Sequence, residues 1–229
     1  MSEWLAKWLA KWLSVTALTV TMVWGLPAAA AGAETVTPAG MPALGKWLLQ
    51  ADGAPADWLG QPYDGKEMRE PINIIIIDRA STTAEEATAR LTAACERAGY
   101  PSRTGHSGRY RAYVGDGFYR QLPAAAFHAF SNAFFGFDNN HGRIFGPYRA
   151  ADGFYFTGAF SREVIDIFAR VKHRYGSFTT ARDNFAGRLA QAGGYRSAGT
   201  AAMENALPAE DGLTTGDHDG LARVLECGP

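Results

Sequence analysis

The stretch that most constrains the fold is residues 71–99, where a short apolar run leads into a helix pattern. Residues 72–77 contain five isoleucines, opened by a proline and closed by Asp78, and this is typical of a strand covered on both faces. From about residue 84 to 98, small and apolar side chains recur every three or four positions, preceded by Ser and Thr N-caps and followed by a glycine. We therefore expect a buried strand with a helix packed against it.

The first 33 residues have the pattern of a secretory signal peptide. Lys7 and Lys11 precede an apolar run over residues 13–26, and an Ala-Gly-Ala motif that ends at Ala33 fits a cleavage site. A repeat of Trp, Leu, Ala and Lys in residues 4–13 offers an alternative, because it could form an amphipathic anchor that stays on the membrane surface. We expect a periplasmic or secreted protein, with cleavage near Ala33.

Composition excludes some classes of function for the remaining chain. Without Lys7, Lys11 and Glu3, the 22 Lys and Arg and 23 Asp and Glu of the full chain become 20 and 22, a net charge of −2, whereas a nucleic-acid-binding domain needs a basic surplus or stripe. No later apolar run reaches the roughly 18 residues that a membrane-spanning helix needs. We expect a mature part that does not span a membrane and binds no nucleic acid. Cys95 and Cys227 fit either a disulfide or two buried thiols.

The rest of the chain predicts a mixed sheet with a second helix. Residues 34–70 are rich in Ala, Gly and Pro and are expected to lie loosely on the surface. Strand patterns at residues 142–146 and 154–160 flank an Asp-Gly turn and favour an antiparallel pair, with Pro147 at an edge or a turn. Further expected elements are strands at residues 109–114, 170–175, 195–202 and 221–227, a mixture of helix and loop at 124–137, and a helix at 180–192. We predict an α+β fold, with a single domain over residues 71–229 in which two main helices pack on a mixed sheet.

Three short polar runs, each with a histidine, lie at the edges of expected strands. The first is residues 138–143, in which Asn140, His141 and Arg143 could bind a ligand, hold a metal ion or supply a general base. A turn in which Asn and Asp bond their own backbone would explain the same residues structurally. In the second run, His173 would share a strand face with apolar neighbours, where a lone histidine is more often a core residue than a ligand.

The third polar run is Asp217, His218 and Asp219, which precede the last expected strand. Their carboxylates and imidazole could bind a metal ion, although the run lacks the remaining ligands of an EF-hand calcium loop. As a tight turn it would need no function. Arg182 and Asp183, at the start of the second expected helix, could join a site formed by these runs.

His106 has a plainer interpretation. Its Gly-His-Ser-Gly-Arg context departs from the nucleophile-elbow motif at the last position, and it follows an expected helix rather than a strand. We therefore do not expect a serine hydrolase. His128, within a run of alanines and aromatic residues, is likewise given no chemical role.

The order of these motifs resembles the LssY C-terminal-like domain family, over about residues 71–189. The similar segments are the isoleucine strand and its helix, the His-Gly-Arg-Ile-Phe run, Gly-Ala-Phe-Ser, Lys-His-Arg and Ala-Arg-Asp. The chain has one histidine where the family tends to have two, at both His141 and His173, and an alanine where an acidic residue precedes Arg-Asp. The resemblance implies a compact α/β domain without an established reaction, and a candidate site of His141, Arg143, His173, Arg182 and Asp183. It also implies a structural alternative, in which Arg143 or Arg182 pairs with Asp183.

These observations lead to three hypotheses of function. The leading one is an exported domain that binds an envelope component in a cleft lined by His, Asp and Asn. The second is an envelope hydrolase assisted by a divalent metal ion, with a bound water as nucleophile. The third is a protein-interaction module, since six tryptophans and the aromatic run at residues 127–137 could form an exposed patch. The residues assigned are His141, His173 and Asp183 for catalysis; Asn140, Arg143, Arg182 and Asp217 for ligand binding; and His141, His173, His218 and Asp219 for a metal ion.

Overall fold

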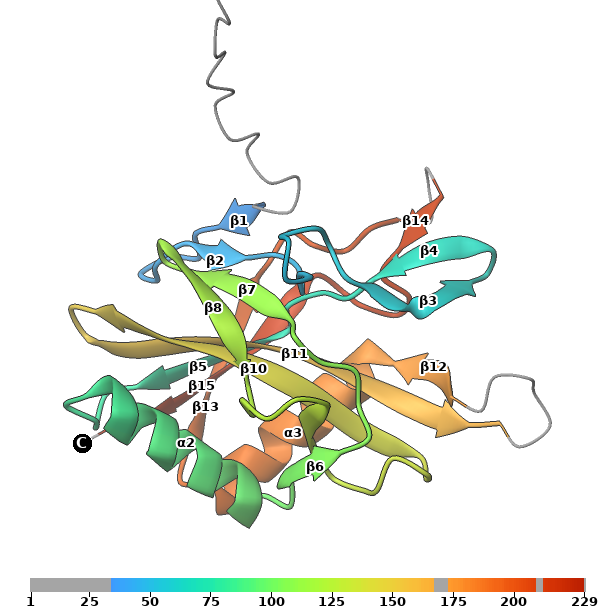
Figure 1. Ribbon diagram of the computed structural model, residues 1–229. Coiled ribbons are helices and arrows are strands. Elements are labelled where there is room, and N and C mark those ends of the chain that lie inside the picture. The colour runs from blue at the N-terminus through green and yellow to red at the C-terminus, as the bar shows by residue number, and fades with distance from the viewer. Residues whose placement is uncertain (1–33, 167–172, 209–211, 229) are drawn as a thin grey trace, which may run out of the picture.

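The computed structural model describes residues 34–166, 173–208 and 212–228 (Figure 1). The expected signal peptide and residues 170–172 of an expected strand lie outside this part of the chain. In the described part, the helices α2 (Ala84–Arg97) and α3 (Phe178–Ala192) lie on one side of a mixed sheet, and the N-terminal strands lie on the other (Figure 1). The fold is richer in strand than the α+β prediction implies, although the mixed sheet with two packed helices is confirmed.

The isoleucine strand lies inside the sheet, as predicted. β5 (Ile74–Asp78) pairs antiparallel with β11 (Gly153–Ile165) and parallel with β15 (Leu221–Cys227). Its side chains alternate between two cores. Ile74 and Ile76 pack with the helices, whereas Ile75 and Ile77 pack with the N-terminal strands. Both faces are therefore covered.

The two helices begin and end close to their predicted bounds. The Thr83 side chain accepts a hydrogen bond from the Glu86 N–H at the start of α2, and Ser177 accepts one from Thr180 at the start of α3. The buried face of α2 includes Leu91 and Cys95. Cys95 and Cys227 are both buried free thiols in this structure.

The longest hairpin in Figure 1 connects β10 (Asn139–Ala150) to β11. The antiparallel pairing agrees with the sequence prediction, but the expected end of the strand at Pro147 is wrong. β10 continues past Pro147 because a β-bulge between Phe145 and Tyr148 takes up the proline without ending the pairing. This one-residue shift sets the register in which residues 139–145 of β10 pair with β11.

Shorter strands complete the sheet. Its order is β1-β2-β7-β8-β10-β11-β5-β15-β13, and β6, β9 and β12 pair beside this path. Their bounds are β1 Thr35–Val36, β2 Leu44–Gly45, β6 Ser102–Thr104, β7 Arg111–Val114, β8 Gly117–Leu122, β9 His128–Ser131, β12 His173–Ser177 and β13 Arg196–Ala202. A separate three-stranded sheet contains β3 Asp57–Tyr63, β4 Lys66–Arg69 and β14 Leu213–Thr214.

Two regions differ from their sequence predictions. Residues 34–70 pack closely rather than loosely, because Trp47, Trp58 and Met68 are at most 2% exposed and anchor the segment. The described run 124–137 contains β9 and no helix. Within the described residues, no helix combines the length and apolar character that crossing a membrane would need.

Candidate metal site

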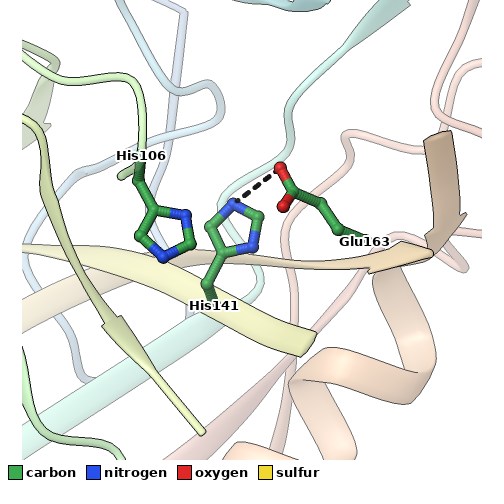
Figure 2. Close-up of side chains that lie close together, drawn as sticks. All are labelled: His106, His141 and Glu163. Atoms are coloured by element: carbon green, nitrogen blue, oxygen red, sulfur yellow. Dashed lines mark ion pairs between the residues drawn. The ribbon is translucent and has the colours of Figure 1, made fainter. Parts of the chain in front are cut away.

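Two strands position the first pair of site residues. β10 and β11 pair so that His141 lies opposite Ser161 and Asn139 lies opposite Glu163. Because successive residues of a strand point to opposite faces, Asn139, His141 and Glu163 share one face of the hairpin. The His141 Nε2 atom lies 3.7 Å from the Glu163 Oε1 atom (Figure 2).

A loop between β6 and β7 adds a third side chain. The His106 backbone N–H donates to the Phe127 carbonyl at 3.1 Å, and the His106 ring stacks on that of His141 with centroids 4.5 Å apart (Figure 2). One ligand atom from each of His106, His141 and Glu163 lies within 4.8 Å of the other two. The three residues are 4%, 3% and 6% exposed. We call this group the histidine–glutamate site.

The hydrogen bonds of Asn139 decide which nitrogen of His141 carries a proton. The Asn139 amide nitrogen donates to the Phe137 carbonyl at 3.0 Å and to Glu163 Oε2 at 3.3 Å. Its oxygen is therefore the atom that faces His141 Nδ1, at 3.0 Å, and it acts as an acceptor. A neutral His141 thus carries its proton on Nδ1 and presents the lone pair of Nε2 to Glu163. In metal-binding histidines, the ring nitrogen that does not bind the metal commonly donates a hydrogen bond of this kind, which orients the ring.

Burial keeps both histidines neutral. Together with the nearby charge of Arg143, burial lowers the pKa of His106 to about 4 and lowers the pKa of His141 well below its usual value. Nε2 of His106 has no hydrogen-bond partner among the described residues. Two neutral imidazoles and a carboxylate are the donor types that Zn²⁺ and similar ions bind. A cation among them would relieve the contact between the His141 lone pair and the Glu163 carboxylate, which are both acceptors.

The spacing of the ligand atoms is close to that of a loaded site. Atoms that lie 2.0–2.1 Å from a tetrahedral ion are about 3.4 Å apart. No separation in the histidine–glutamate site therefore needs to close by more than about 1.4 Å, which side-chain rotation can supply. His173 offers a further nitrogen, because its Nδ1 lies 3.2 Å from Glu163 Oε2 and its ring lies parallel to that of Phe135.

Two charged side chains border the site. Arg143 shares the face of His141 on β10, and its Nη2 donates to the Ser107 carbonyl at 2.6 Å. Glu70 follows β4 and is 5% exposed. Burial raises the pKa of Glu70 to about 7, with the charge of Arg143 opposing the rise and that of Glu163 adding to it. A carboxyl that titrates near neutral pH therefore lies close enough to Glu163 to sense its charge.

The structure places the third polar run elsewhere, at the N-terminus of α3. The Asp217 carboxylate accepts hydrogen bonds from the Ser177 hydroxyl at 2.5 Å and from the Phe178 N–H at 2.7 Å, and also from the Tyr175 and Thr179 hydroxyls. Asp217 is therefore a capping residue, and its lone pairs are occupied by protein donors.

The remaining predicted site residues also have protein partners. Arg182 is 3% exposed, and it pairs with Asp183 at 2.8 Å and with Asp219. The ion pair between Arg182 and Asp183 that the sequence analysis gave as a structural alternative is therefore present. Nε2 of His218 lies 2.8 Å from the Asn205 Oδ1, and burial lowers the pKa of His218 to about 4. We call Asp217 together with Arg182, Asp183, His218 and Asp219 the helix-cap cluster.

The structure thus divides the predicted residues between two places. His141, His173 and Arg143 lie together, whereas Asp217 and the other residues of the helix-cap cluster have their contacts around α3. The side chain of Asn140 points to the other face of β10. Its backbone N–H donates to the Asn132 side chain at 2.8 Å. The metal set that combined His141 with His218 and Asp219 is not brought together.

Sequence reasoning missed His106, Glu163 and Glu70. No local motif marks them, because the site forms only when a loop, two strands and the segment after β4 meet. The one available signal was the alternation of Asn139, His141 and Arg143 on an expected strand, which predicts a shared polar face.

The predicted aromatic patch is exposed only in part. Trp47 and Trp58 are buried, and Phe130 is 1% exposed, whereas Phe127, Phe134 and Phe137 are exposed by 59%, 49% and 67%. The described tryptophans therefore belong to the core rather than to a docking surface.

Comparisons with protein-family models, with curated proteins and with solved structures found no match to this chain. The resemblance to the LssY C-terminal-like domain family accordingly stays a prediction. Any functional conclusion rests on the geometry of the histidine–glutamate site.

Proposed function

We propose that this protein is an exported domain that binds a divalent transition-metal ion of the Zn²⁺ type through His106, His141 and Glu163. The observation that carries the proposal is the approach of three buried ligand atoms to within 4.8 Å of one another. Two of the donors are imidazoles that burial keeps neutral. His173, at 3.2 Å from Glu163, is the fourth protein ligand or the residue beside an exchangeable fourth position.

Unpaired ligand atoms support the proposal because, in this site, they lie beside other potential ligands. Buried polar atoms normally have partners, and each unpaired one costs roughly 1–3 kcal/mol. Here Nε2 of His106 has none among the described residues, and Nε2 of His141 faces a carboxylate across 3.7 Å. A bound cation would satisfy both nitrogens and the Glu163 carboxylate at once.

The proposal is tested by measuring metal binding to the purified full chain. After chelation and dialysis, Zn²⁺ is titrated calorimetrically, and its stoichiometry is measured by elemental analysis. We expect one Zn²⁺ per chain and a loss of affinity of more than about 100-fold in the Glu163→Gln variant, because the anionic ligand is removed. Co²⁺ in place of Zn²⁺ should give the visible absorption bands of a four-coordinate site with nitrogen and oxygen ligands.

A matched control is His218→Gln. His218 is buried like His106, its pKa is also lowered to about 4, and its Nδ1 also lacks a partner, but it does not belong to the group of close potential ligands. This variant should bind Zn²⁺ as the natural protein does. Absence of stoichiometric metal, or equal losses in His218→Gln and in a folded Glu163→Gln protein, would contradict the proposal.

Metal-assisted hydrolysis is a second candidate function, and Glu70 is the observation that favours it. A carboxyl whose pKa is about 7 can accept a proton at neutral pH, as the general base of a hydrolase must. The charges of Arg143 and of the proposed ligand Glu163 both act on this carboxyl.

The hydrolase candidate predicts turnover of a simple activated ester by the Zn²⁺-loaded protein. With p-nitrophenyl acetate as the probe, Glu70→Gln should lower the rate by about 100-fold while the Zn²⁺ stoichiometry stays at one. A loaded protein that does not hydrolyse the ester above the rate of the buffer would leave metal binding alone as the proposed function.

A further inference from the structure

The outer face of the β7–β8 hairpin carries an unusual cross-strand pair. Arg111 on β7 is directly opposite Arg120 on β8. Like charges in such positions destabilise a sheet by a few tenths of a kcal/mol to about 1 kcal/mol. Burial and the charge of Arg120 also lower the pKa of Arg111 below its usual value. The hairpin therefore holds two cations close together against their mutual repulsion.

These two arginines line a pocket with a third. The pocket has a volume of about 370 Å³, and Arg109 joins Arg111 and Arg120 in its wall. The other lining residues are Ala51, Tyr110, Gln121 and the alanines at positions 124–126, so the wall contains no acidic side chain. None of the three arginines forms an ion pair with a residue that the structure describes.

The backbone at the rim of the pocket is strained. Arg109 has a φ of +75°, in the left-handed region that residues other than glycine rarely adopt. Directly after it, the Tyr110 N–H donates to the Gln121 side chain at 3.0 Å, which fixes the segment against β8. The conformation is thus held by neighbouring residues, and it brings Arg109 to the same concave surface as the β7–β8 pair.

We propose that this pocket binds a phosphate-bearing ligand through Arg109, Arg111 and Arg120. Guanidinium groups bind phosphate oxygens in a bidentate manner, and such charge-assisted hydrogen bonds are among the strongest in proteins. A phosphate dianion would neutralise most of the charge of the three side chains and turn the repulsion between Arg111 and Arg120 into shared attraction. The ligand is either a free phosphorylated compound or the headgroup of an anionic lipid, which present the same chemistry.

Inorganic pyrophosphate is the first probe, titrated calorimetrically into the full-length protein at low ionic strength. We expect saturable binding at one site, weakened at least ten-fold in the Arg111→Gln/Arg120→Gln double variant. Arg188→Gln is a control for charge alone, because it removes one positive charge from an exposed position on α3, and it should leave pyrophosphate binding unchanged. Arg120→Lys keeps the charge but loses the planar fork, and should bind with intermediate affinity.

Flotation with vesicles distinguishes the two sources of phosphate. Binding to vesicles of phosphatidylglycerol but not of phosphatidylcholine, lost in the double variant, would assign the pocket to a lipid headgroup. Binding of pyrophosphate without vesicle binding would assign it to a free compound. Binding of neither probe, or equal binding by the double variant, would overturn the proposal. Zn²⁺ binding is independent of these outcomes, because the variants do not alter the histidine–glutamate site.

Discussion

In the histidine–glutamate site, His106, His141 and Glu163 are 3–6% exposed, yet an imidazole nitrogen lacks a partner and another faces a carboxylate. In the helix-cap cluster, Asp217 and Asp219 face Ser, Thr, Tyr, backbone and Arg donors. Both places offer carboxylate and imidazole side chains. They differ in what the carboxylates contact: hydroxyl, backbone and arginine donors surround Asp217 and Asp219, whereas Glu163 faces the ring nitrogens of His141 and His173.

This difference explains why we propose a metal site in one place and not in the other. Carboxylates that accept several hydrogen bonds and ion pairs have little to gain from a metal ion, because binding would first break those contacts. A neutral imidazole nitrogen that has no hydrogen-bond partner, such as Nε2 of His106, gains one when it binds a metal ion beside other ligands. The same residue types therefore stabilise the start of α3 in one place and, in the other, bring three potential metal ligands together.

The largest effect on stability is expected from Arg182→Ala. The substitution removes a buried guanidinium that pairs with Asp183 and Asp219 and donates to the Leu221 carbonyl at 2.8 Å. We expect the free energy of unfolding, measured by urea denaturation, to fall by about 3 kcal/mol. Zn²⁺ affinity of the folded variant should be unchanged, and a loss of affinity would show that the two clusters are coupled.

Asp217→Ala should have the next largest effect. It removes the carboxylate that accepts from the Phe178 N–H and the Ser177 hydroxyl at the start of α3. The free energy of unfolding should fall by about 2 kcal/mol in the same assay. Asp116→Ala, at an exposed turn, is the control and should change it by less than about 0.5 kcal/mol. If the two variants are equally stable, Asp217 does not act as a cap.

The metal-free protein should lose stability as the pH falls from about 6.5 to about 4. In this window the unfolded chain binds protons on His106 and His218, whose folded pKa values are lowered to about 4, whereas the folded protein does not. The loss should reach up to about 1 kcal/mol per pH unit for each histidine, and protonation of Glu70, whose folded pKa is raised to about 7, opposes part of it. Denaturant titrations at several pH values measure it. His218→Gln should reduce the slope in this window, and an unchanged slope would mean that His218 is not held neutral.

The smallest effect is expected from Phe135→Leu. Its ring lies parallel to that of His173, with centroids 6.3 Å apart, and orients a nitrogen near Glu163. We expect Zn²⁺ affinity to fall about three-fold, as loss of one aromatic contact implies. Phe127→Leu, at a side chain that is 59% exposed, should leave the affinity unchanged. A larger loss in Phe127→Leu than in Phe135→Leu would remove His173 from the site.

Much of the fold could be predicted because local patterns agree with the tertiary structure. The isoleucine run, the Thr and Ser caps and the Asp-Gly turn each indicate the element that they form. Residues 34–70 could not be predicted in this way, since their tryptophans are buried by contacts that are distant in sequence. Such packing overrides the Gly and Pro content that indicates a loop.

The site was harder to predict than the fold, and the β-bulge explains why. Counting back from the Asp-Gly turn without a bulge would place His141 opposite Arg162, whereas the observed partner is Ser161. Because a slip of one residue moves every side chain to the other face, the unbulged register separates His141 from Glu163. The polar face of β10 was therefore visible in the sequence, but its partner on β11 was not.

The position of β15 also has a consequence for how the chain folds. β5 is flanked by β11 and β15, and its parallel pairing joins Ile74 to Arg223. The isoleucine strand therefore keeps one open edge until a partner that is far away in sequence arrives, and contacts of this kind slow folding. Delayed closure leaves the backbone groups of this edge unpaired for longer. It also makes the isoleucine strand a segment prone to aggregation whenever folding is interrupted.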